Sequence, residues 1–272
     1  MLTDIEKLPA VQLGDFLLQI ELDEPAEHVF NIAKTELRET PETVQSAVDE
    51  LRRLLAGNKL ESSIWGLYYA FKLKHHKHYD GLMPSKEQNI FMQNILTVLP
   101  NRDQLGRRIL VIELGKKWKT NKCSLDEVFK GCVLFLEAAM LEPETQICGA
   151  VVVFDMEGLT MQQVWQFTPP FAKRIVDWLQ ESIPLRIKGL YIINQPYIFN
   201  MVFQLFKPFL QEKLRSRIIF MGNDREQLHK YISPKSLPEV YGGTLTLPRV
   251  TVFFSISAIN SYGYRNEKKE KK

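Results

Sequence analysis

The chain has 272 residues, of which 45% are hydrophobic and 25% are charged, and its formal net charge at pH 7 is +3. This length and composition are typical of a globular protein of one large or two modest domains with a sizeable core. The small net charge gives no indication of nucleic-acid binding. The three cysteines show no CxxC spacing, which argues against a disulfide framework or a zinc site.

The amino terminus, MLTDIEKLPAVQ, carries acidic residues where a signal peptide has a basic start and an apolar run. No stretch reaches the roughly 18 consecutive apolar residues of a membrane-spanning helix. We therefore expect a cytoplasmic protein that is neither secreted nor membrane-spanning. Basic residues gather at 71–78, at 186–217 and in the tail RNEKKEKK, which is predicted to be disordered.

The first hundred residues predict helices, because their apolar residues recur at helical spacing. Gly57 is a natural stop for the second of them. The predicted helices run from about residue 25 to 39, 41 to 56, 62 to 76 and 84 to 96. Residues 1–94 are thus expected to form a small helical domain.

From residue 107 onward the pattern changes to short aliphatic runs, each too continuous for a half-exposed strand. These runs are RRILVIEL (107–114), GAVVVFDM (149–156), RIKGLYII (186–193) and RSRIIFM (215–221). Helices with good caps are predicted between them, at 124–141 with a Ser124/Glu127 capping box, at 168–182 after Thr168, and after Asn223. The alternation predicts an α/β fold with a mostly parallel sheet.

No catalytic signature is present. The strand at 107–114 is followed by GKKWKT, which lacks both GxGxxG and the P-loop glycine, and neither GxSxG nor HExxH occurs. His75, His76 and His78 point in different directions on a helix, which favours a solvated basic face over a metal site. Asp155 and Glu157 follow a strand, where α/β enzymes keep catalytic groups, but a structural turn is favoured because no base or nucleophile is paired with them.

The helices between the strands are more apolar than one sheet layer needs. Helices 124–141 and 168–182 and the segment NQPYIFNMVFQLFKPFL (194–210) all carry apolar residues on more than one face. Core packing accounts for most of these residues. A hydrophobic cavity would use the surplus.

The stretch from WQFTPPF to RSRIIFMG, followed by LPEVYGG, closely resembles the CRAL-TRIO lipid-binding family, in particular the branch of the α-tocopherol transfer protein and cellular retinaldehyde-binding protein. The similarity runs from about residue 95 to 247, with GRRILV, GAVVVFDMEG, INQP, FKPFL and YGG in the family's order. It implies a lipid-binding domain at 95–250 and an extension at 251–272.

The resemblance implies a cytoplasmic carrier, not an enzyme, that needs no cofactor or metal. It would hold one tocopherol-, retinoid- or similar lipid-like molecule under a mobile lid, residues 198–210, and exchange it at phosphoinositide-containing membranes. An α/β enzyme with an unrecognised signature remains a further alternative. So does a non-transporting interaction protein with a degenerate pocket.

Site residues are carried over by position from the family. The ligand-binding positions are Phe129, Cys132, Val133, Leu136, Phe154, Phe167, Ile175, Trp178, Leu179, Ile183, Leu185, Ile187, Phe206 and Leu210. The membrane-contact positions are Met161, Trp165, Ile198, Val202 and Leu205. The phosphoinositide-binding positions are Arg186, Lys188, Lys213 and Arg217.

The chain departs from the family pattern at several places. Cys132 and Leu136 stand where the tocopherol protein has serines, so the pocket suits a less polar ligand end. Val240 replaces the usual glutamate before Tyr-Gly-Gly. Between Leu60 and Ser63 about one helix of the amino-terminal domain is missing, including a basic residue of the family's phosphoinositide site.

Overall fold

A computed structural model of the chain describes residues 11–13, 16–56 and 64–246. The predicted tail at 251–272 and the position of the expected missing helix, 57–63, lie outside these ranges. No helix within the described ranges combines the length and apolar composition that crossing a bilayer needs. All three cysteines are unpaired.

The centre of the molecule is a five-stranded sheet in the order β3-β4-β5-β6-β7. The long strands match the four aliphatic runs and pair in parallel, while the short β3 pairs antiparallel at one edge. The strands are β3 (Leu96–Val98), β4 (Arg108–Glu113), β5 (Ala150–Asp155), β6 (Ile187–Ile193) and β7 (Ile218–Gly222). The predicted α/β fold with a mostly parallel sheet is confirmed.

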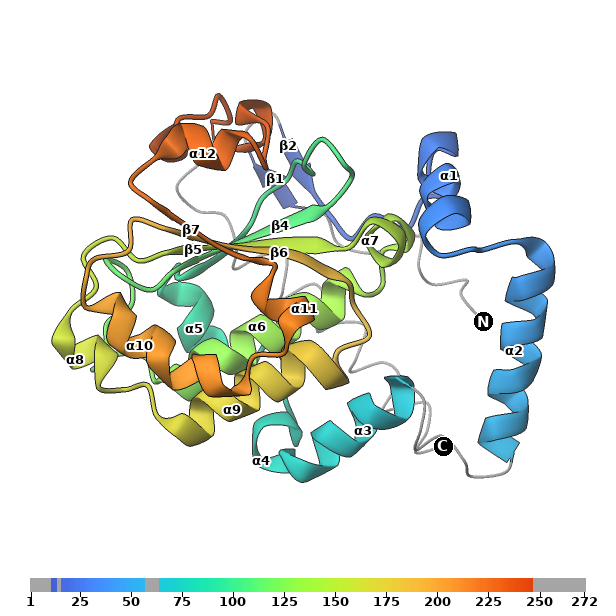
Figure 1. Ribbon diagram of the computed structural model, residues 1–272, viewed down its shortest axis with the longest axis horizontal. Coiled ribbons are helices and arrows are strands. Elements are labelled where there is room, and N and C mark those ends of the chain that lie inside the picture. Colours follow the sequence, from blue (N-terminus) through green and yellow to red (C-terminus); the bar gives the residue numbers. More distant parts are fainter. Residues whose placement is uncertain (1–10, 14–15, 57–63, 247–272) are drawn as a thin grey trace.

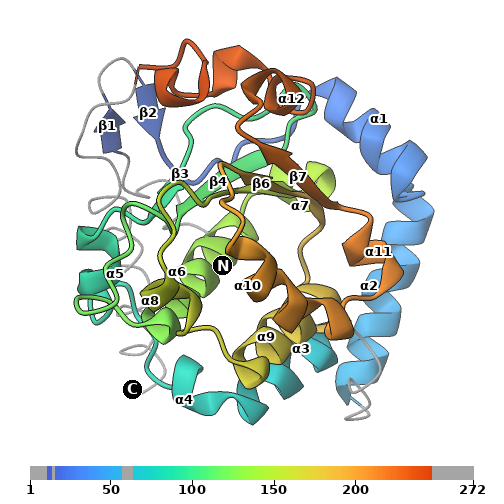
Figure 2. The same ribbon diagram turned by 60° about the vertical axis from the view of Figure 1, so that its left-hand side comes forward.

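Helices cover both faces of this sheet (Figure 1). Most of them lie on one face, and α12 lies on the other, as the turned view also shows (Figure 2). The elements of the larger layer are α5 (Gln88–Met92), α6 (Leu125–Ala139), α8 (Met161–Val164), α9 (Pro169–Asp177) with the π-helical turn Trp178–Ser182, α10 (Phe199–Phe206) with the 3-10 turn Lys207–Phe209, and α11 (Glu212–Arg215). The opposite face carries α12 (Arg225–His229) and the 3-10 turns Pro234–Ser236 and Glu239–Tyr241.

The sheet separates two hydrophobic cores, one on each of its faces. Alternate strand residues such as Ile109, Val151 and Tyr191 pack with Leu228 and Ile232 on the α12 side. The alternate set, such as Leu110, Val152 and Leu190, faces the larger helical layer and joins the main core. Continuous aliphatic strands are therefore explained by burial on both faces.

The amino-terminal part contains α1 (Glu27–Glu36), α2 (Pro41–Ala56), α3 (Ile64–Lys74) and α4 (His76–Tyr79), preceded by a hairpin of β1 (Val11–Leu13) and β2 (Phe16–Leu18). The hairpin was not predicted. The predicted helix 84–96 is wrong in extent, because α5 ends at Met92 and Asn94 has a left-handed φ of 52°. The chain then enters β3, which pairs with β4.

Helix caps follow the sequence closely. The Ser124/Glu127 capping box of α6 is confirmed, and the Thr168 side chain accepts a hydrogen bond from the Phe171 amide at the start of α9. The cap predicted at Asn223 lies one residue later, because the Asp224 side chain accepts from the Gln227 amide.

A buried ion network fixes the first residue of β4 to α7 (Pro143–Cys148). Arg108 Nη2 and Nε lie 2.6 and 3.0 Å from the two carboxylate oxygens of Glu142. Arg102 Nη2 also donates to Glu142, at 3.0 Å, and Thr145 Oγ1 donates to it at 2.6 Å. Both Arg108 and Glu142 side chains are only 5% exposed, so this ion pair is largely shielded from water.

Candidate functional site: an apolar cavity beneath helix α10

The floor of the site is the sheet face toward the larger helical layer. Every second residue of a strand shares one face, and the register aligns these residues across neighbouring strands. One row consists of Leu110, Val152, Leu190 and Ile218, and the next row consists of Ile112, Phe154 and Ile192. All of these side chains line a single cavity.

Helices α6 and α9 form the walls. Their lining residues recur at the three- and four-residue spacing that places them on one helix face. Phe129 of α6 and Trp178 of the π-helical turn meet edge to face, with ring centroids 5.2 Å apart. The wall residues are Leu125, Val128, Phe129, Cys132 and Leu136 from α6, and Phe171, Ile175, Val176, Trp178 and Leu179 from α9 and its π-helical turn.

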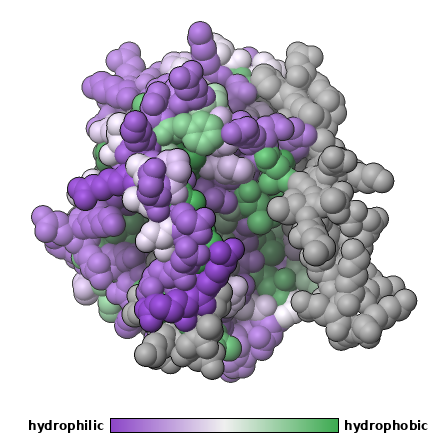
Figure 3. All heavy atoms as spheres, turned by 90° about the vertical axis from the view of Figure 1, so that its right-hand side faces the viewer, coloured by the Kyte–Doolittle hydropathy of each residue, from purple (hydrophilic) through white to green (hydrophobic). Residues whose placement is uncertain are grey.

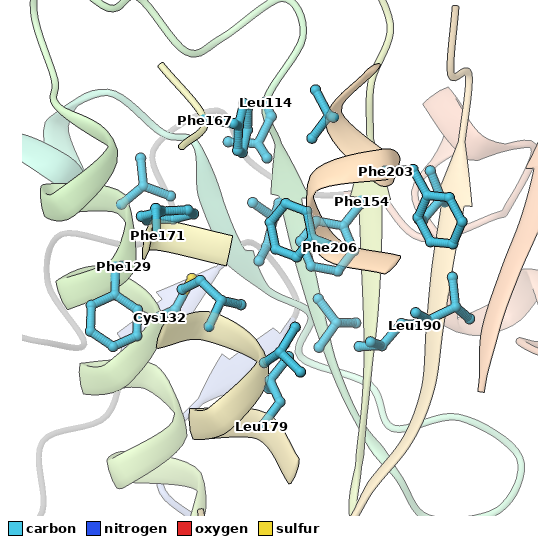
Figure 4. A pocket seen from close by; sticks show the side chains of 18 of the residues that line it. Leu114, Phe129, Cys132, Phe154, Phe167, Phe171, Leu179, Leu190, Phe203 and Phe206 are labelled. Carbon is cyan, nitrogen blue, oxygen red and sulfur yellow. The ribbon is translucent and has the colours of Figure 1, made fainter. Parts of the chain in front are cut away.

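Helix α10 closes the cavity from the side opposite the sheet. Its inner stripe is formed by Phe199, Val202, Phe203 and Phe206, which all line the cavity. Its outer side exposes Met201 and Gln204. Figure 4 shows side chains from the sheet, the wall helices and α10 pointing into the same space.

The cavity is small and apolar. Its volume is about 160 Å³, and every residue that lines it is aliphatic, aromatic, methionine or cysteine. An engineered apolar cavity of about 150 Å³ stays dry and holds benzene, so the present space fits about one ring. Burial raises the pKa of the Cys132 thiol to about 12, so this sulfur is uncharged at physiological pH. The cavity can therefore bind a hydrophobic molecule and select it by shape.

Most of the ligand-binding positions carried over from the family lie on this cavity. They are Phe129, Cys132, Leu136, Phe154, Phe167, Ile175, Trp178, Leu179, Phe206 and Leu210. Val133, Ile183, Leu185 and Ile187 are buried in the same core but do not line the cavity. Sequence reasoning missed most of the sheet floor and Phe199, Phe203 and Val202 as lining residues. The alternation within each predicted strand was the available signal for the floor.

The predicted membrane-contact residues do not share one environment. Met161, the first residue of α8, is 36% exposed, and Trp165, which follows the helix, is 72% exposed. Ile198 and Leu205 are half-buried. Val202 is 3% exposed, because the helical period places it on the inner stripe with Phe199 and Phe206. Tyr197 at 89% and Met201 at 49% are exposed instead, and sequence reasoning did not single them out for this surface.

Three of the four predicted phosphoinositide-binding residues, Arg186, Lys188 and Arg217, lie near the amino-terminal end of β6. Arg186 Nη2 and Lys188 Nζ lie 2.6 and 2.7 Å from Oε2 of Glu36. Arg186 Nη1 also donates to the carbonyl oxygen of Ile147, and Arg217 Nη1 donates to that of Ile187, each at 2.6 Å. Lys213 is exposed.

Asp155, considered above as a catalytic candidate, is 6% exposed and fully engaged in hydrogen bonds. Its carboxylate accepts from Tyr241 Oη at 3.1 Å, from Asn194 Nδ2 at 3.0 Å and from the Glu157 amide at 2.9 Å. Asp155 thus ties the end of β5 to the Tyr-Gly-Gly turn.

The histidines have equally local roles. His76 Nδ1 lies 3.1 Å from Asp80, and His78 Nε2 lies 2.8 Å from Arg174. Burial lowers the pKa of His75 and His78. The described part of the chain contains no cluster of His, Cys, Asp or Glu that could hold a metal ion.

Comparison with known proteins gives consistent matches. A family model described as the CRAL/TRIO domain matches residues 92–243. Clavesin-1 of Rattus norvegicus is 36% identical over 148 residues, which are 54% of this chain and 42% of that protein. The α-tocopherol transfer protein-like protein of Mus musculus is 34% identical over 166 residues, which are 61% of this chain and 48% of that protein.

Among solved structures, the crystal structure of Sfh5 matches with a TM-score of 0.50 and 18% identity, covering 88% of this chain and 84% of that one. This likeness concerns the fold. The chain spans a little under half the length of the curated relatives it matches.

Proposed function

Because this chain belongs to the CRAL/TRIO domain family, we propose that it is a carrier that binds one hydrophobic molecule beneath α10 and exchanges it at phosphoinositide-containing membranes. The observation that carries the proposal is the wholly apolar cavity between the sheet, α6, α9 and α10. Similarity to a protein named α-tocopherol transfer protein-like supports it. We also propose that the chain consists of a helical amino-terminal domain (1–94), a lipid-binding domain (95–250) and a carboxyl-terminal extension (251–272).

The cavity volume indicates how a ligand enters. At about 160 Å³ the cavity is smaller than the usual 300–1,000 Å³ of a ligand pocket. A tocopherol- or retinoid-like molecule therefore requires α10 to move outward. The Phe206 ring packs against the main hydrophobic core and meets the Phe167 ring at a centroid distance of 6.3 Å, so this movement breaks apolar contacts that a ligand can replace.

The energetics favour exchange over permanent retention. Burial contributes roughly 0.8 kcal/mol per CH₂, so a ligand with about fifteen to twenty buried carbons gains on the order of 12 to 16 kcal/mol before costs. A bilayer offers the same gain. The carrier thus competes with the membrane, and the rate at which the lid opens matters as much as affinity.

Membrane docking would combine apolar and basic contacts. Trp165, Met161 and Tyr197 are exposed at α8 and just before α10, the helix that lines the cavity and packs against α8. Aromatic side chains suit the bilayer interface. Basic residues near anionic lipid contribute roughly 1 kcal/mol each. Such docking is reversible, which a carrier needs.

In this proposal the cavity holds the ligand and the basic surface docks the protein on the membrane. Lys188→Ala combined with Lys213→Ala tests whether these two roles are separate. These lysines are chosen because Arg186 and Arg217 also hold backbone carbonyls. Losing about 2 kcal/mol of attraction should slow transfer of a fluorescent tocopherol to anionic vesicles on the order of tenfold to thirtyfold. Ligand affinity should stay within about twofold, because neither lysine lines the cavity.

The control is Lys230→Ala with Lys235→Ala, which removes the same charge near α12, on the sheet face opposite the cavity. Transfer by the control should match the unmodified protein. Equal losses of affinity and of transfer in the Lys188/Lys213 variant would contradict separate roles for pocket and surface. A protein that transfers no ligand and binds none would instead favour a non-transporting interaction protein.

A further inference from the structure

The carboxylate of Glu36 occupies the basic site at the start of β6. Its Oε2 atom accepts from both Arg186 Nη2 and Lys188 Nζ, at 2.6 and 2.7 Å. One anionic oxygen shared by two cations is also how a phosphate oxygen is held by charge-assisted hydrogen bonds. Glu36 therefore stands in for the anion that the site would bind.

The packing of α1 delivers this carboxylate to the site. Val29 and Ala33 are 0% and 3% exposed, and they pack against Ile147 and Cys148 of α7. Glu36 follows Ala33 by three residues and so lies along the same helix face. Because Arg186 Nη1 is fixed by the Ile147 carbonyl, the guanidinium keeps its place whichever anion it holds.

Protonation does not release the contact at physiological pH. Hydrogen bonds from Lys188 and Arg186 lower the pKa of Glu36 to about 2. Glu36 is thus ionised throughout the physiological range, and another anion must displace it.

Displacement by such an anion is feasible. The Glu36 side chain is 48% exposed, and the Arg186 and Lys188 side chains are 28% and 17% exposed. Ion pairs this accessible to water are weak. A phosphate monoester carries a charge of about −1.5 to −2 and three acceptor oxygens, so it competes well against a single carboxylate. Hydrophilic side chains cover much of the side of the molecule that carries α1 and α2, next to a hydrophobic patch, and the hydrophilic part suits a charged headgroup (Figure 3).

We propose that Glu36 is an internal competitor of a phosphorylated lipid headgroup at Arg186 and Lys188, so that headgroup binding releases the last turn of α1. This inference rests on the proposed function, which assigns these two residues to the headgroup. It makes membrane engagement dependent on the density of phosphorylated lipid.

The test is Glu36→Gln in the full chain, with binding measured to phosphatidylcholine vesicles containing a few mole per cent of phosphatidylinositol bisphosphate. The expected result is binding about threefold to tenfold tighter, because the competitor loses its charge but keeps its shape. The affinity for soluble inositol trisphosphate should rise by a similar factor. Glu36→Asp keeps the charge but is one methylene shorter, and should show part of the gain.

The matched control is Glu39→Gln, which removes the same charge three residues away, from a side chain with no hydrogen bond or ion pair to the described residues. An equal gain in this control would overturn the proposal, because general surface charge would then explain the result. So would a gain confined to vesicles, without any for inositol trisphosphate. Thermal unfolding of each variant verifies that the fold is intact.

Lys188→Ala, made in the unmodified and the Glu36→Gln proteins, separates this inference from the proposed function. If Lys188→Ala weakens binding but Glu36→Gln has no effect, the headgroup site stands and the competitor is refuted. If Lys188→Ala leaves binding unchanged in both proteins, the headgroup site itself is wrong, and the competitor falls with it.

Discussion

Phe206→Asp is expected to empty the cavity and to weaken binding of a hydrophobic ligand by at least about 100-fold, or roughly 3 kcal/mol. Phe206 lies on the inner stripe of α10 and packs edge to face with Phe167. A carboxylate there meets only apolar side chains, so it escapes toward water and holds α10 away from the sheet. The measurement is ligand bound per protein after incubation with loaded vesicles.

The control for this prediction is Gln204→Asp, which introduces the same carboxylate on the exposed side of the same helix. We expect ligand content close to that of the unmodified protein. An unchanged ligand content in Phe206→Asp, with an intact fold, would show that Phe206 is ordinary core and that the ligand does not lie beneath α10.

Glu142→Ala is expected to lower the free energy of unfolding by about 3–5 kcal/mol, the usual cost of removing one partner from a buried ion pair. Arg108 would keep Glu21, at 2.9 Å, as its remaining carboxylate partner, and that side chain is 37% exposed. Thermal unfolding should show a fall in Tm on the order of 10 °C. Differential scanning calorimetry measures it.

Glu144→Ala serves as the comparison, since Glu144 lies in the first turn of α7, two residues after the N-cap Glu142, and reaches Arg102 Nε only at 3.7 Å. Its loss should cost less than about 1 kcal/mol. Similar costs for both substitutions would mean that the Glu142 network contributes no more than a surface contact. The anchoring of β4 to α7 would then need another explanation.

The sheet could be predicted because its strands are buried on both faces. RRILVIEL and GAVVVFDM contain nearly uninterrupted aliphatic runs, which are typical of a parallel strand buried on both faces. The end of α5 could not be predicted, because a helical pattern continues through Asn94 into Leu96. Pairing of β3 with β4 is a tertiary interaction that local spacing does not encode.

The cavity was predicted in part. The helices that form the cavity walls could be predicted from the excess of apolar residues at 124–141 and 168–182. The rows of strand residues that form the floor could not, because they depend on the register between strands. Val202 was assigned to the membrane side, whereas the period through Phe199, Phe203 and Phe206 turns it inward. The contact of Glu36 with Arg186 and Lys188 joins residues about 150 positions apart, so nothing in either local sequence indicates it.

The central claim, that the cavity beneath α10 holds one hydrophobic molecule, is tested most directly by native mass spectrometry. The protein should be purified from a eukaryotic cytosol under mild conditions, weighed intact, and then extracted to identify what is bound. The predicted result is one stoichiometric lipid-like molecule, absent from Phe206→Asp. A clean apo mass that persists after incubation with retinoid, tocopherol and phospholipid vesicles would contradict the claim.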